Sequence, residues 1–252
     1  MRLEVLRSAA LCWFGNEHLF SADDSSLSEI SLKSCFRGVE RLEFVRPNAH
    51  QFAAPGAGFV LGTRTWFRRL KVDGTESLRL HLPLSVLEPL PALCGIVGDS
   101  PNGCDIWVQS ARSTARSVEY TAQRFPVWSL PRLESAADVA AKLAEAIASL
   151  AAEVADLGTP LARRIAGLAV SFEEPGGQAE GFEDCIPPEF SPKWKHLSAQ
   201  AIRTVAMLGA GDLGLDRQAA QEHVDAVWKL ALRLLEAICA EVVGEHSQAA
   251  AA

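Results

Sequence analysis

The chain has no long apolar run, and its first residues do not resemble a secretory signal. No stretch approaches the roughly 18 consecutive apolar residues that a membrane-spanning helix requires. Residues Met1 to Glu4 place an acid where a secretory signal is basic and then apolar. We therefore expect a cytoplasmic protein that does not associate with a membrane.

The cysteines and histidines do not form a recognisable metal or redox site. The chain contains six of each, but it has no CxxC pair and no cysteine close to a histidine at the spacing of a zinc site. Cys12 and Cys239 lie in apolar stretches, so we expect them to be buried thiols. An even number of cysteines does not indicate a disulfide framework in a chain with this many core-forming residues. The sequence predicts no metal and no cofactor.

Motifs of the common enzyme classes are missing as well. The sequence contains no GxSxG nucleophile elbow, no HExxH metalloprotease motif and no Walker A loop. Its histidines are scattered, so a cysteine–histidine pair would have to be assembled by the fold. These absences favour a non-catalytic protein, and they leave the catalytic residues of any enzyme in this chain unknown.

The net charge of −7 is unevenly distributed along the chain. Residues 1–130 contain 14 Lys and Arg against 13 Asp and Glu, whereas residues 131–252 contain 10 against 18, so the two halves carry +1 and −8. An acidic C-terminal half repels the phosphate backbone, which argues against nucleic acid as a partner. A local basic patch in the first half is compatible with this balance.

The first half has the pattern of short strands separated by turns. Residues 2–14 read as an opening strand that Gly15 and Asn16 end. Apolar alternation between turn residues predicts further strands at 27–32, 41–46, 59–72, 77–84, 92–98, 104–110 and 117–124. The chain up to residue 131 is therefore predicted to form a mostly antiparallel sheet of short strands.

The strongest β signal is a hairpin formed by residues 59–72 and 77–84 around an Asp-Gly turn. A three-residue loop places Leu70 beside Leu78 and collects the apolar side chains on one face, which a two-residue loop does not. The other face then carries a basic stripe, which we predict to bind an anion or a partner: Arg69, Lys71, Arg79 and His81. A solvated outer face of a half-buried hairpin explains the same residues without a binding role.

At Pro131 the composition changes to alanine-rich helical periodicity. Helices are predicted at 136–157, 160–170, 194–208 and 215–246, from apolar residues that repeat at steps of three or four. Ser135 with Asp138 forms a capping box before the first of these helices. The chain is therefore predicted to be an α+β protein, with a β-rich region at 1–131 and a helical region of about four helices at 132–252. Whether the two regions share one core is open.

Two features of the helical region point to a partner. The last helix has an apolar face wide enough to contact more than one neighbouring element, built from residues such as Val227, Leu234 and Ile238. Trp194 lies between two lysines just after an acidic stretch, so we predict that it is exposed and contacts a partner.

Two further segments have both a structural and a functional explanation. Residues 209–214 match the GxGxxG pattern of dinucleotide-binding loops, but too little chain follows to supply the second strand of that fold. A glycine-rich turn between two helices explains them better. Residues 173–193 form an acidic loop without the ligand spacing of a calcium site, so a solvated loop is favoured over a partner-docking segment.

These observations favour a non-catalytic cytoplasmic interaction protein, a subunit or adaptor of a multi-protein assembly. Its expected partners are other protein subunits or further copies of the same chain. The alternative is an enzyme whose dispersed site lies on the basic face of the hairpin and acts on a phosphorylated or acidic substrate.

Overall fold

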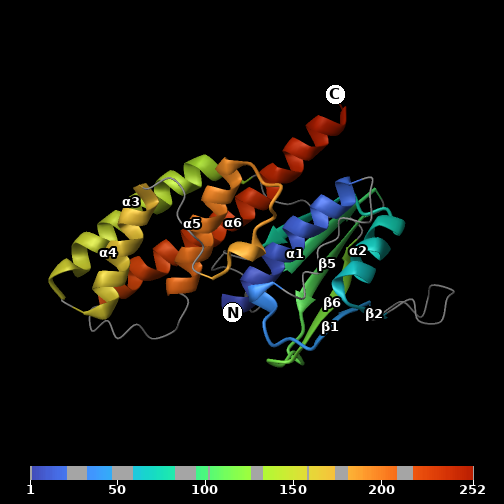
Figure 1. Ribbon diagram of the computed structural model, residues 1–252, viewed down its shortest axis with the longest axis horizontal. Coiled ribbons are helices and arrows are strands. Elements are labelled where there is room, and N and C mark those ends of the chain that lie inside the picture. Colours follow the sequence, from blue (N-terminus) through green and yellow to red (C-terminus); the bar gives the residue numbers. More distant parts are fainter. Residues whose placement is uncertain are drawn as a thin grey trace. The chain divides into compact units, whose positions relative to one another are not determined.

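The computed structural model describes residues 2–21, 33–46, 59–82, 95–101, 103–125, 133–157, 159–173, 181–208 and 218–251. In these residues the chain is an α+β protein with a six-stranded mixed sheet and six α-helices (Figure 1). The α+β class is confirmed, but the helices number six rather than about four because two of them lie in the N-terminal half. The chain divides into a sheet unit, Leu3–Arg132 with Val242–Ala252, and a helical unit, Leu133–Glu241 with Met1–Arg2.

The sheet has the strand order β2-β1-β6-β5-β4-β3. Neighbouring strands are antiparallel except for β1 and β6, which are parallel. The strands are β1 (Arg41–Val45), β2 (Phe59–Leu61), β3 (Ser77–His81), β4 (Gly95–Ser100), β5 (Gly103–Gln109) and β6 (Ser117–Phe125).

Four predicted strands are confirmed with small shifts at their ends. Residues 41–46, 92–98, 104–110 and 117–124 correspond to β1, β4, β5 and β6. The turn predicted between the strands at 92–98 and 104–110 joins β4 to β5, where Ser100 pairs with Gly103. The strand predicted at 27–32 lies outside the described residues.

The strand predicted at residues 2–14 is wrong, because this segment is the helix α1 (Arg2–Phe20). Every residue from Val5 to Asn16 is buried, so the apolar pattern has neither the period of a strand nor that of an amphipathic helix. Gly15 and Asn16 do not end the segment. They lie inside the helix and contact the sheet.

The predicted hairpin of residues 59–72 and 77–84 is also wrong. Only Phe59–Leu61 is a strand, and Thr63–Val72 is the helix α2. Asp73 and Gly74 end this helix: Gly74 has a φ of +74°, and the Thr75 amide donates to the Leu70 carbonyl at 2.9 Å. Since a helix separates the two segments, β3 pairs with β4 instead.

Both N-terminal helices cover the same face of the sheet. The Trp66 ring of α2 stacks on Phe44 of β1, with centroids 4.0 Å apart and planes at 4°, and Phe44 stacks in turn on Tyr120 of β6. The Tyr120 hydroxyl lies 3.2 Å from the Ser8 hydroxyl of α1. Figure 1 shows α1 and α2 side by side on this face. Their contact forms an aromatic core that fixes both helices on the sheet.

The four helices predicted in the C-terminal half are confirmed, and the last of them is divided between the two units after Glu241. They are α3 (Ala136–Val154), α4 (Pro160–Glu173), α5 (Pro192–Leu208) and α6 (Gln218–Ala251). Ser135 caps α3 as predicted, since its hydroxyl accepts from the Asp138 amide. Within the described residues, none of the helices combines the length and the apolar character that a membrane span requires.

Helices α3 and α6 run antiparallel and contact each other at both ends. The Glu241 carboxylate of α6 accepts a hydrogen bond from the Ala136 amide at the start of α3, at 2.5 Å. At the other end, Glu153 of α3 pairs with His223 of α6. The two contacts are 17 residues apart on α3 and 18 apart on α6, as two antiparallel helices of equal rise require.

The wide apolar face of α6 is buried. Every residue from Ala231 to Cys239 is buried except Arg233. Cys12 and Cys239 are buried thiols, as predicted.

The prediction that Trp194 is exposed is wrong, because its side chain is 2% exposed. Trp194 lies in the first turn of α5, with the Lys193 ammonium 4.1 Å from the ring centroid. The flanking lysines are exposed while the ring between them is buried, so the charge of a residue's sequence neighbours did not predict its own exposure here.

Candidate functional site

The structure does not bring the four predicted binding residues together in one stripe. Arg69 and Lys71 lie in the last turn of α2, whereas Arg79 and His81 lie on β3. Leu78 and Leu80 of β3 are buried, and Asn16 of α1 contacts the backbone of Leu78. Because side chains alternate along a strand, Arg79 and His81 point to the opposite face. Arg79 forms an ion pair there with Asp99, with Nε 3.1 Å from the carboxylate oxygen.

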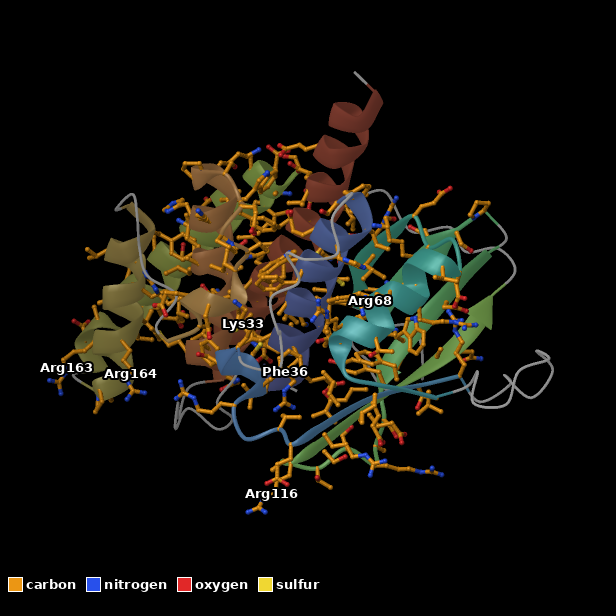
Figure 2. The ribbon with its side chains drawn as sticks, turned by 45° about the vertical axis from the view of Figure 1, so that its right-hand side comes forward. Lys33, Phe36, Arg68, Arg116, Arg163 and Arg164 are labelled. Atoms are coloured by element: carbon orange, nitrogen blue, oxygen red, sulfur yellow. The ribbon has the colours of Figure 1, made fainter. Side chains whose placement is uncertain are left out.

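The outer side of α2 gathers basic residues that the hairpin prediction had divided between two strands. Arg64, Arg68 and Lys71 are exposed, and their spacing of i, i+4 and i+7 places them along one side of the helix. Figure 2 labels Arg68 on this helix. Arg69 is exposed on the adjoining side. The helix contains no acidic residue, and with Asp73 directly after it the segment carries a net charge of +3.

The inner side of α2 holds the helix rigidly on the sheet. Trp66, Phe67 and Leu70 are each at most 1% exposed. Trp66 also contacts Trp107 of β5 edge to face, with centroids 5.4 Å apart. Burial of three large side chains stabilises a helix of ten residues that would not form alone in water. The basic side is therefore presented in one fixed orientation.

The C-terminal end of α2 is held by a network of charged groups. The guanidinium of Arg46, just after β1, donates to Asp73 at 2.5 Å and to Asp105 of β5 at 2.6 Å. Its carbon lies 5.3 Å from the centroid of the Trp107 ring. Arg69 forms a second ion pair with Asp73 at 3.0 Å. The two carboxylates are thus matched by two guanidinium groups.

Lys71 connects the two helices that cover the sheet. Its ammonium donates to the carbonyl of Ser21, directly after α1, at 2.7 Å. A cation at this position satisfies a carbonyl left over at the helix C-terminus and interacts favourably with the helix dipole. Lys71 therefore has a structural role as well as a share in the basic surface.

Exposed apolar side chains lie at both ends of the segment that contains α2. The described residues include four large hydrophobic side chains that are exposed, and two of them are Leu61, at 55%, and Val72, at 80%. Val72 follows Arg68 by four residues and shares the outer side of α2. Leu61 ends β2 and points to the side of the sheet opposite α2, since it pairs with Glu43 while Val60 pairs with Phe44.

This surface combines exposed cations with exposed apolar side chains. Each cysteine that the structure describes is buried. No group of three or more His, Cys, Asp or Glu side chains that could hold a metal occurs among the described residues. The helical spacing of Thr63, Trp66, Phe67 and Leu70, which is i, i+3, i+4 and i+7, was the sequence signal for this surface.

The remaining sequence candidates do not form a second site in the described part of the chain. The GxGxxG segment at 209–214 lies outside the described residues, as do residues 174–180 of the acidic loop. The described end of that loop forms a short 3-10 helix, Glu183–Cys185. His223 pairs with Glu153, and His196 contacts the side chain of Gln200 at 2.9 Å. No family model, curated protein or solved structure matches the chain.

Proposed function

We propose that this chain is a non-catalytic interaction protein, a subunit or adaptor, that uses the outer side of α2 to bind an acidic surface of another protein. The observation that carries the proposal is the exposed row of Arg64, Arg68 and Lys71 on a helix that has no acidic residue and is anchored by Trp66. Anchoring supports binding because a rigid helix loses little conformational freedom when a partner docks.

Two features favour a protein partner over a nucleic acid. Val72 extends the basic row with an exposed aliphatic side chain, which contributes nothing to phosphate binding but is buried well by apolar groups of a protein. Proteins that bind DNA through its backbone commonly neutralise about 6 to 10 phosphates, and the segment from Thr63 to Asp73 carries a net charge of only +3.

The enzymatic alternative loses the location on which it depended. It required Arg69, Lys71, Arg79 and His81 on one hairpin face, and the structure places these residues in pairs on α2 and on the opposite side of β3. Arg79 is paired with Asp99. His81 is the second residue after Arg79 on the same strand. No observation on the described residues favours a second function.

Selection of random displayed peptides against the full chain tests the proposal. We expect enrichment of peptides that combine Asp or Glu with aliphatic residues, because these match the charge and the exposed Val72. Reversing charge in the Arg64→Glu, Arg68→Glu double variant should weaken their binding by about tenfold or more, equivalent to about 1.4 kcal/mol.

The matched control is the double variant Arg163→Glu, Arg164→Glu. These two arginines are also exposed and lie on α4 (Figure 2), so the change in net charge is the same. Peptides that bind α2 should retain their affinity for this variant. Equal weakening by both double variants would show that net charge alone attracts the peptides, and selection without enrichment of acidic residues would also contradict the proposal.

A further inference from the structure

The two edges of the sheet differ in how their outward-facing backbone groups are satisfied. At the β3 edge, the Asn16 side chain of α1 donates to the Leu78 carbonyl at 2.8 Å and accepts from the Leu78 amide at 2.7 Å. A side-chain amide thereby occupies the place that a further strand would take. A strand cannot add to β3 at Leu78 without displacing this buried contact.

The β2 edge has no such cap among the described residues. The Gly62 amide donates to the Leu42 carbonyl at 2.9 Å, and Phe44 pairs with Val60 two residues further along β1. In an antiparallel pair, residues bonded to the partner strand alternate with residues whose backbone groups point away from it. The amide and carbonyl groups of Phe59 and Leu61 therefore face outward, and no backbone group of the described residues bonds to them across this edge.

Helix α2 begins beside this edge. Thr63 follows the end of β2 by two residues, so the first turn of α2, which contains Arg64, lies close to Leu61. The N-cap residue is Gly62, which has no side chain to accept from the first-turn amides. Arg64 and this helix end both favour a carboxylate on the α2 side of the edge. On the other side of the sheet, the exposed side chain of Leu61 favours an aliphatic group.

We propose that the partner binds by adding an extended segment to the β2 edge. The segment pairs its backbone with Leu61 and Phe59, and its side chains alternate between acidic residues that face Arg64 and aliphatic residues that contact Leu61. The occupant is therefore an acidic, strand-forming segment of another protein. This inference rests on the proposed function, because it specifies how an acidic partner reaches the basic side of α2.

The test uses a synthetic peptide of alternating glutamate and valine with the full chain. Leu61→Pro removes the outward amide of Leu61 and is compatible with an edge strand, since proline lacks only a donor that β1 does not use. We expect Leu61→Pro to weaken binding by about tenfold, because the hydrogen bond donated by the Leu61 amide is lost together with the adjacent backbone hydrogen bonds. Leu61→Val keeps the amide and an aliphatic side chain, so it should bind as the unmodified chain does.

A second measurement covers the case in which Leu61→Pro does not fold. The same peptide, N-methylated at every residue, keeps every side chain but loses all of its backbone donors, and it should not bind. Hydrogen exchange at the Leu61 amide of the unmodified chain should slow when the unmethylated peptide is added.

The outcomes separate this inference from the proposed function. If the peptide depends on Arg64 and Arg68 but binds equally well after N-methylation and without protection of Leu61, strand addition is wrong and docking on α2 stands. If the peptide fails to bind the unmodified chain, both are contradicted. Full binding by Leu61→Pro, once its fold is verified, would overturn strand addition alone.

Discussion

The side chain of Asn16 forms two hydrogen bonds with the backbone of Leu78, one as donor and one as acceptor. Asn16 is fully buried, so neither group of Leu78 can turn to water if the side-chain amide is removed. The pair joins the C-terminal half of α1 to the edge of the sheet. It also satisfies one of the buried polar side chains of α1, which include Arg7, Ser8 and His18 as well as Asn16.

Replacing Asn16 with alanine should lower the free energy of unfolding by about 2 to 4 kcal/mol, because a buried donor and a buried acceptor are left unsatisfied. Urea denaturation would measure the change. Gln221→Ala is the control, since its side-chain amide forms an exposed hydrogen bond with Asp225, and it should change stability by less than about 0.5 kcal/mol. A similar loss in both variants would show that Asn16 has no special role at the sheet edge.

Gly15 and Gly167 should respond in opposite directions to substitution by alanine. Both lie inside helices, where alanine is favoured by about 0.5 to 1 kcal/mol. A Cβ atom at Gly167 meets nothing within 4 Å, so Gly167→Ala should stabilise the protein. A Cβ atom at Gly15 would lie 2.8 Å from Phe67 Cε1 and closer still to Leu78 Cδ1, so Gly15→Ala should destabilise it by about 1 to 3 kcal/mol. Thermal unfolding of the two variants would compare them, and stabilisation by both would mean that α1 does not pack closely on Leu78.

Arg46 should be more important for stability than an ordinary surface arginine. Its guanidinium joins Asp73 and Asp105, so Arg46→Leu leaves two carboxylates near each other and should cost about 2 to 3 kcal/mol. Arg46→Lys should recover little of this, because one ammonium does not reproduce the fork that bonds both acids. Arg116→Leu, which removes an exposed pair with Glu40, should cost less than about 1 kcal/mol in the same denaturation assay. Full recovery by lysine would indicate that only the charge of Arg46 is needed.

Glu4 should make the stability depend on pH. Burial raises the pKa of its carboxyl above the ordinary value of 4.5 and outweighs the attraction of nearby positive charge, including that of Arg7. The folded chain then binds a proton more readily than the unfolded chain, so the free energy of unfolding falls as the pH rises from about 4.5 through the folded pKa, and stays lower above it. Glu4→Gln removes this titration. The free energy of unfolding of the variant, relative to that of the unmodified chain, should therefore increase as the pH rises from about 4.5 through the folded pKa. Denaturation at a series of pH values would show it, and a difference that does not vary with pH would contradict the assignment.

The sequence predicted those elements whose apolar period is unambiguous. Strands β4, β5 and β6 combine alternation with turn residues, and α3 has both a clear helical period and the Ser135 cap. It failed for α1, where residues buried on all sides leave no period to read. It failed for α2 because an Asp-Gly pair that ends a helix was read as a hairpin turn, although the spacing of Trp66, Phe67 and Leu70 indicated a helix.

The candidate site was predicted only in part for the same reason. Arg69 and Lys71 lie on the basic helix, and their role in binding stays a prediction, whereas Arg79 and His81 were joined to them through a pairing that does not form. Arg64 and Arg68 were nearby in the sequence, but only a helix brings them into one row with Lys71. The Asn16 contact with Leu78 had no local signal, because it joins residues 62 positions apart.

The division of α6 between the two compact units has a consequence for biosynthesis. The sheet unit comprises Leu3–Arg132 and Val242–Ala252, and Val242 and Val243 are both buried. A ribosome therefore completes the whole helical unit before it supplies the final segment of the sheet unit. Nascent chains usually fold from the N-terminus onward, but here the unit that is begun first is finished last, so chains truncated after residue 241 should present an incomplete sheet unit to chaperones.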